Sequence, residues 1–216
     1  MAVDYQTLKE RQRQERDNHP ENAALRIHRA LSWLNRAVQC EDLDGRFVFL
    51  WIAFNAAYAN ELGEISVSES ELFDNFLKRL IDLDKNKNLY NVVWKQYTSA
   101  IRVLLDNHYI YQPFWNHHNG FPGYEDWQEG FKLSKQAAHR ALAANDTATV
   151  LSIVFKRLYT LRNQIIHGGA TYNSSANRDQ MRDATSILGE VVPSIIEIML
   201  DNAKAYWGEA CYPVVD

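Results

Sequence analysis

Apolar residues recur at helical spacing over most of the chain, and this pattern constrains the fold more than any other feature. Between Ala23 and Cys40, for example, they fall near the 3.6-residue period of a helix, with arginines elsewhere on the helical wheel. Only nine glycines and five prolines interrupt the 216 residues, and no segment shows the alternation typical of a strand. The sequence therefore predicts an all-α fold, a helical bundle of about six or seven helices.

The helical pattern divides the chain into a polar start and one domain. Residues 1–20 are rich in charged residues and glutamine, and we expect a polar N-terminal tail or a frayed helix that ends at Pro20. Residues 21–216 are expected to form a single helical domain around one core. The predicted helices cover about residues 23–40, 45–62, 66–83, 89–108, 127–144, 147–167 and 178–206.

Several residues are expected to begin, end or bend these helices. Asp44 and Asp146 precede helical runs and are of the type that caps a helix N-terminus. Gly168 and Gly169 follow a run, as glycines do at a left-handed stop, and the helices on either side of them are expected to pair antiparallel. Pro193 lies inside the last run and should bend or interrupt it.

The stretch "YIYQPFWNHHNGFPGYEDW" breaks the helical pattern with two prolines, two glycines and many aromatic residues. We therefore expect a long aromatic-rich insertion loop at about residues 109–126. A hydrophobic patch that holds the loop is favoured over a surface for stacking on bases. His117 and His118 lack further ligands at a suitable spacing, so a solvated pair is favoured over a metal site. The rings of this patch are Phe114, Trp115, Phe121, Tyr124 and Trp127.

Charge and cysteine content exclude some classes of protein. The formal net charge is −4, which disfavours extensive nonspecific binding to nucleic acid but leaves room for a few focused arginines. Cys40 and Cys211 suggest neither a disulfide scaffold nor a zinc site, and they fit a reduced intracellular protein. The polar start is no signal peptide and no apolar run reaches the roughly 20 residues of a membrane span. A cytoplasmic protein without a cofactor is expected.

The stretch "TLRNQIIHGGATYN", residues 160–173, is where the sequence indicates chemistry. Helix packing does not explain Arg162, Asn163 and His167. Arginine presents a planar fork that suits phosphate oxygens, and histidine exchanges a proton near neutral pH. Together they suffice for RNA cleavage without a metal, in which the ribose 2′-hydroxyl attacks the adjacent phosphorus. Asn163 is expected to hydrogen-bond the histidine, the arginine or the substrate.

The spacing of the two groups places a geometric condition on this chemistry. Positions five apart on a helix differ by roughly 140° around its axis. Arg162 and His167 therefore need a distorted last turn before Gly168 and Gly169, or a second subunit that contributes its own copy across a shared groove. Asn55, on the second predicted helix, and Asp44, just before it, are polar groups of which one is expected to face this motif.

The segment "RNQIIH", Arg162 to His167, resembles the motif of the HEPN superfamily: arginine, four to six intervening residues, then histidine, with a polar residue after the arginine. The resemblance covers residues 23–207 and makes 21–216 a HEPN-like domain. It implies a helical bundle, a homodimer through the motif-bearing helices, and often metal-independent endoribonuclease activity. Many members act in toxin–antitoxin, phage-defence or RNA-processing systems, so an antitoxin protein is an expected type of partner.

Three functional interpretations follow. In the first, the chain is an endoribonuclease with Arg162, Asn163 and His167 as catalytic residues. In the second, a non-catalytic HEPN-like module binds a nucleotide, RNA or a partner protein. In the third, the motif only caps a helix, since cations suit helix C-termini. Lys156, Arg157 and Arg178 are expected to bind the substrate's phosphates, or simply to cover a solvated face.

Overall fold

The computed structural model describes residues 3–59 and 69–212, and within them it confirms the all-α prediction. These residues form ten α-helices, more than the six or seven expected, and no strand. The parts of two predicted helices at 60–62 and 66–68 lie outside the described residues. The helices are α1 (Tyr5–Glu15), α2 (Glu21–Val38), α3 (Leu43–Tyr58), α4 (Glu69–Leu83), α5 (Asn88–Asn91), α6 (Thr98–Asp106), α7 (Gln112–His118), α8 (Trp127–Ala143), α9 (Thr147–Ile166) and α10 (Arg178–Asp201).

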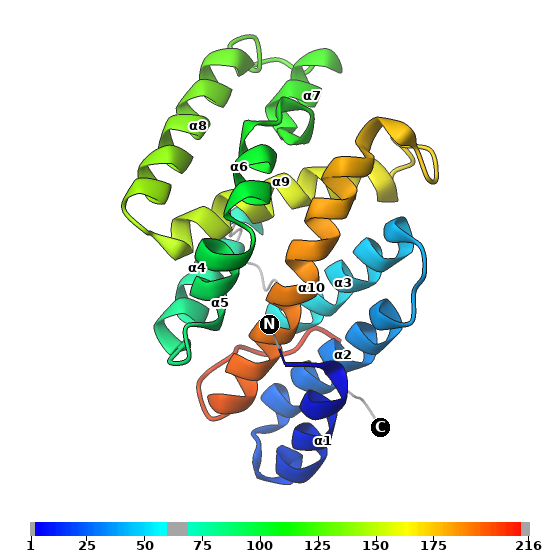
Figure 1. Cartoon of the computed structure of the whole chain (residues 1–216), viewed down its shortest axis with the longest axis vertical. Coiled ribbons are helices and arrows are strands. Elements are labelled where there is room, and N and C mark those ends of the chain that lie inside the picture. The colour runs from blue at the N-terminus through cyan, green and yellow to red at the C-terminus, as the bar shows by residue number, and fades with distance from the viewer. Residues whose placement is uncertain (1–2, 60–68, 213–216) are drawn as a thin grey trace.

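Helix α10 runs through the middle of the molecule (Figure 1). Helices α1, α2 and α3 lie on one side of it, and α6, α7 and α8 lie on the other. Helix α2 packs along α3, while α9 packs along α4 and α8. Figure 1 shows α9 running across the direction of α10. The antiparallel pairing expected for these two helices is therefore wrong, because each of them packs along other helices.

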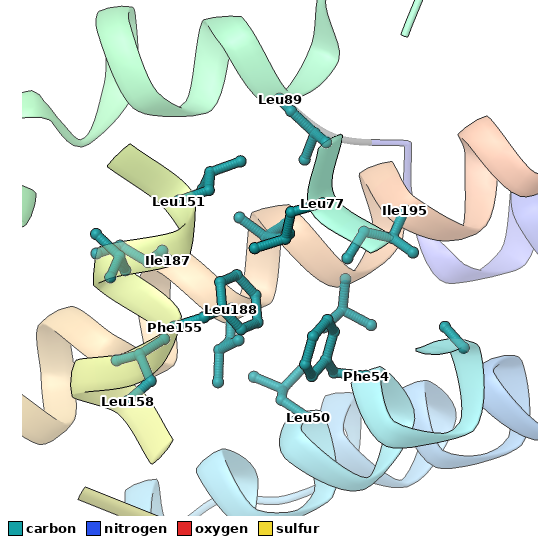
Figure 2. Close-up of a cluster of buried hydrophobic side chains, with 14 of the residues drawn as sticks. Leu50, Phe54, Leu77, Leu89, Leu151, Phe155, Leu158, Ile187, Leu188 and Ile195 are labelled. Carbon is teal, nitrogen blue, oxygen red and sulfur yellow. The ribbon is translucent and has the colours of Figure 1, made fainter. Parts of the chain in front are cut away.

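The core lies where α3, α4, α5, α9 and α10 meet (Figure 2). Phe54 from α3 and Phe155 from α9 have no exposed surface, and their ring centroids lie 4.4 Å apart. Leu188 of α10 is equally buried. A fully buried side chain of this size stabilises the fold by about 1.5–3 kcal/mol, so these contacts hold α9 and its C-terminal motif in place. None of the described helices combines the length and apolar character needed to span a membrane.

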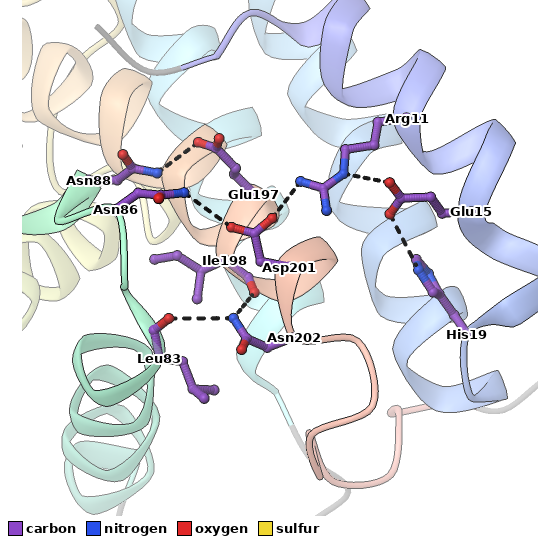
Figure 3. A network of polar contacts seen from close by, with 10 residues as sticks. All are labelled: Arg11, Glu15, His19, Leu83, Asn86, Asn88, Glu197, Ile198, Asp201 and Asn202. Atoms are coloured by element: carbon purple, nitrogen blue, oxygen red, sulfur yellow. Dashed lines mark hydrogen bonds and ion pairs between the residues drawn. The ribbon is translucent and has the colours of Figure 1, made fainter.

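The segment expected to be a solvated tail or frayed helix forms α1, which is packed against α2 and α10. Leu8 is only 1% exposed. Asp4 caps the helix by accepting a hydrogen bond from the Thr7 amide. Figure 3 shows the polar side of this contact: Arg11 donates to Asp201 of α10 at 2.7 Å, and Asp201 also accepts from Asn86. One buried leucine and one ion pair thus anchor a segment whose composition is mostly polar.

The expected insertion loop at 109–126 contains a short helix, α7, so that part of the prediction is wrong. Pro113 does not break the helix, because it lies in the first turn of α7. There, proline's missing N–H would have no partner in any helix. The helix expected at 89–108 is divided, because a π-helical turn joins α5 to α6. Both differences raise the helix count.

One helix cap differs from expectation, and one of the two effects expected of Pro193, an interruption of its helix, does not occur. The cap of α3 is Asp42, whose carboxylate accepts from the Gly45 amide at 2.7 Å, and not Asp44. Helix α10 continues through Pro193 without interruption. Pro193 is itself buried, and so are Val192 and Ile195 beside it, so packing of this part of α10 outweighs the lost backbone hydrogen bond.

Candidate functional site at the end of helix α9

The C-terminus of α9 ends in the glycine stop that the sequence predicts. Asp146 caps the other end, as expected, by accepting from the Thr149 amide. Gly168 has a φ of 70°, a left-handed conformation that favours glycine. The amide of Ala170 donates to the carbonyl of Gln164 at 3.1 Å. The turn therefore satisfies a backbone carbonyl that would otherwise be left without a partner at the helix end.

Arg162 and Asn163 interact directly. Arg162 Nη1 donates to Asn163 Oδ1 at 2.8 Å, so the asparagine holds the guanidinium. The guanidinium carbon lies 5.9 Å from the centroid of the Tyr159 ring, one turn earlier on α9. Both Arg162 and Asn163 are half-buried. The arrangement orients the guanidinium and leaves part of it open to solvent.

His167 is exposed and is the first residue after α9. Its backbone angles, φ −91° and ψ 9°, depart from those of a regular helix. Among residues 3–59 and 69–212, none forms a side-chain hydrogen bond with its imidazole. The backbone thus leaves the helical conformation at His167.

The loop after the motif is held by Asp44 of α3. Asp44 Oδ2 accepts from the amide of Asn173 at 2.7 Å, and its Oδ1 accepts from Arg178 Nη2 at 2.5 Å. Arg178 also donates from Nε to the carbonyl of Ser174. Arg178, one of the predicted phosphate ligands, is therefore placed as an anchor for this loop.

The other two predicted phosphate ligands also have partners within the protein. Lys156 Nζ lies 3.0 Å from Asp74 Oδ2 on α4. Arg157 is only 3% exposed and donates to Ser134 Oγ on α8 at 2.9 Å. Burial lowers the pKa of Arg157 to about 10, and the nearby Tyr111 opposes this shift. Because its charge is buried, Arg157 contributes to the packing of α9 against α8 and lies out of reach of a substrate.

The carbonyl of Tyr109 connects the motif helix with the aromatic segment. It accepts from Gln164 Nε2 of α9 and from Trp115 Nε1 of α7, both at 2.7 Å. Gln164 thus ties the end of α9 to the aromatic segment. Phe114 is 8% exposed and packs edge-on against Trp115 and Trp127, so these three rings form part of the expected hydrophobic patch, whereas Phe121 is 56% exposed.

A cavity of about 920 Å³ lies between the aromatic segment, the end of α9 and the start of α10. Asn163 and Gln164 line it from α9, Tyr109 and Trp115 from the aromatic segment, and Asn177 from the residue before α10. Its volume is typical of a ligand site. Asn163 therefore contacts both Arg162 and this cavity.

The residues that line the cavity include only part of the predicted motif. Asn163 is among them, but Arg162 and His167 are not among the described residues that line it. Sequence reasoning missed the amide groups of the lining, such as Asn107 and Gln112. The one signal was their density, since asparagine and glutamine are frequent in residues 107–119. These groups come from separate segments, so no motif spacing could reveal them.

Comparison with known proteins does not assign the chain to a family. No protein-family profile, curated protein or solved structure matches it. The function is therefore argued from the geometry at the end of α9 and from the chemistry of the cavity beside it.

Proposed function

We propose that this chain is a HEPN-like endoribonuclease that cleaves RNA through attack of the ribose 2′-hydroxyl, without a metal ion. The observation that carries the proposal is the hydrogen bond from Arg162 to Asn163, which holds a guanidinium close in the chain to the exposed His167. A cation in a fixed orientation and an imidazole that solvent can reach are the two groups that this reaction needs.

Each residue has a separate role in the proposed reaction. The imidazole of His167 removes the proton from the 2′-hydroxyl, and the O2′–P bond forms as the P–O5′ bond breaks. The guanidinium of Arg162 stabilises the negative charge that grows on the phosphate oxygens. Asn163 orients the guanidinium through the bond described above. The products are a 2′,3′-cyclic phosphate and a 5′-hydroxyl, which leaves with a proton from the imidazolium.

The proposal includes a homodimer through the motif-bearing helices, which would bring two guanidinium and two imidazole groups to one groove. Ile166 is 49% exposed and Tyr172 is 75% exposed, so apolar surface lies close to His167 in the chain. A toxin–antitoxin or phage-defence setting, with an antitoxin protein as a partner and the cytoplasm as the place of action, completes the proposal.

Cleavage of structured and unstructured RNA in the presence of EDTA tests the proposed activity. We expect cleavage by the wild-type protein and a loss of about 100-fold or more in the Arg162→Ala and His167→Ala variants. Arg102→Ala and His139→Ala are matched controls, since both residues are exposed on other helices. Mass spectrometry of the products should find the cyclic phosphate. Absence of cleavage, or equal cleavage by all four variants, would contradict the proposal.

A second candidate, a non-catalytic module that binds a nucleotide, RNA or a partner protein, is favoured by one observation. The cavity is lined by Asn163 but not by Arg162 or His167 among the described residues, so a ligand can bind there without meeting the imidazole. Saturable binding of RNA or nucleotide without cleavage would support this candidate over the nuclease.

A further inference from the structure

The lining of the cavity is uncharged and combines amide and hydroxyl groups with apolar surface. Its described residues include amides, hydroxyl groups and two aromatic rings, and none of them carries a formal charge near neutral pH. A site for phosphate or a carboxylate would present cations toward the ligand. We propose that the cavity binds a nucleobase, either in a free nucleoside or in a single strand of RNA. This inference deepens the proposed function, and it rests on that function only for the position of the phosphate.

Hydrogen bonds within the protein fix which end of each amide remains for a ligand. Asn163 uses its oxygen to accept from Arg162, and Asn107 uses its oxygen to accept from the Tyr109 amide, so each keeps an NH₂ group. Gln164 and Gln112 instead use their NH₂ groups as donors, so each keeps a carbonyl oxygen. Four lining amides thus have two NH₂ groups and two carbonyl oxygens that these bonds leave unused.

This mixture of donors and acceptors matches the edges of nucleobases. Each base presents neighbouring donor and acceptor atoms, which asparagine and glutamine amides pair with directly. Trp115 and Tyr109 supply the rings on which a base stacks. The indole of Trp115 is fixed by its hydrogen bond to the Tyr109 carbonyl. Stacking and amide contacts are therefore available in the same cavity.

Asn177, which also lines the cavity, has a side-chain oxygen without a hydrogen-bond donor among the described residues. This oxygen, Oδ1, is shielded from solvent. A buried acceptor without a donor destabilises the protein. An amino or imino group of a bound base would remove this destabilisation once the amide turns toward the cavity.

The position of Arg162 favours a nucleotide over a neutral sugar as the ligand. Its guanidinium is one hydrogen bond away from Asn163, which lines the cavity. A base in the cavity would leave its phosphate outside, where Arg162 is half-buried and positively charged. A carbohydrate has no group that uses this cation.

Calorimetric titration of the full chain with nucleosides tests the inference. The ligands are adenosine, guanosine, cytidine and uridine, their monophosphates, and glucose and N-acetylglucosamine as sugars. We expect at least one nucleoside to bind at a single site, with its monophosphate binding several-fold more tightly. Asn119→Ala and Gln180→Ala, which remove lining amides, should weaken binding about three- to tenfold. Gln128→Ala, an exposed amide on α8 that is not among the lining residues, should leave binding unchanged.

Arg162→Ala should remove the advantage of the monophosphate, so that nucleoside and monophosphate bind with equal affinity. Equal affinity for nucleoside and monophosphate in the wild-type protein would overturn the placement of the phosphate. Absence of nucleoside binding, binding of sugars alone, or unchanged affinity in the Asn119 and Gln180 variants would overturn the base site. Nucleoside binding by a protein that does not cleave RNA would support the base site while rejecting the nuclease, so the two failures are distinguishable.

Discussion

Arg157 has no carboxylate partner among the described residues, although it is buried. Its guanidinium carbon lies 4.5 Å from the Tyr111 ring centroid and 5.2 Å from that of Phe131. Its Nη2 donates to Ser134, but its Nε has no hydrogen-bond partner within the described part of the chain. The side chain thus fills space between α8 and α9, while its charge carries a desolvation cost that the aromatic rings only partly offset.

Substituting Arg157 separates these two contributions. Arg157→Met fills most of the same volume without the charge, and we expect its free energy of unfolding to stay within about 1 kcal/mol of wild type. Arg157→Ala leaves a cavity and should destabilise the protein by about 2–4 kcal/mol. Urea denaturation measures both values. If the methionine variant were as unstable as the alanine variant, the charge itself would be stabilising.

The carboxylate of Asp42 caps the N-terminus of α3. Its bond to the Gly45 amide is the largest cause of a lowered pKa, followed by the contact with the Cys40 thiol. A carboxyl whose pKa is lowered on folding stabilises the protein above its ordinary pKa of 3.8. That contribution is lost as the pH falls through the folded value. Gly45 suits this cap, since a Cβ there would lie 2.8 Å from Asp42 Oδ2.

The Asp42 variants should therefore respond to pH. Near neutral pH, Asp42→Ala should destabilise the protein by about 1 kcal/mol, and Asp42→Asn by less, since asparagine also caps helices. Below pH 3.8 the difference between wild type and Asp42→Ala should shrink, because the wild-type carboxyl gains a proton. Denaturation curves over this range provide the measurement. A difference that does not change with pH would show that the ionised carboxylate has no part in the cap.

At the scale of elements, local sequence signals predicted where the helices lie along the chain better than they predicted which helices pack together. Helix α9 was predicted almost to the residue, because Asp146 and Gly168 act within a few residues of the ends that they define. The cap of α3 was missed by two positions, since Asp42 and Asp44 are alike in sequence and only the structure separates their roles. Helix α7 was missed because proline is favoured in the first turn of a helix but disrupts its interior, and the sequence does not show which position Pro113 occupies.

The candidate site shows the same limit. The sequence pointed to Arg162, Asn163 and His167, and the structure places the first two in contact. It could not indicate that Arg157 is buried or that Arg178 holds a loop, because both depend on residues of other helices. The cavity was beyond prediction for the same reason: its amides come from segments that only folding brings together.

In the proposed dimer, two whole molecules meet at the surface close to the motif. Exposed apolar side chains near His167 in the chain, Ile166 and Tyr172, are part of the surface that the proposed interface would cover. Light scattering at micromolar concentration should therefore find a dimer, and Ile166→Lys should shift it toward monomer. Val103→Lys is the matched control, since Val103 is 55% exposed on α6. If the wild-type protein were a monomer, the shared groove would be excluded, and any active site would have to form within a single protomer.

The clasp formed by Asp44 and Arg178 has a consequence for affinity. It ties Asn173 and Arg178 to α3, because one carboxylate receives both a backbone amide and a guanidinium. A ligand that enters the neighbouring cavity then meets a wall that is already ordered, and little conformational entropy is lost on association. The loop before α10 can therefore line a binding site for a small molecule without a large entropic loss of affinity.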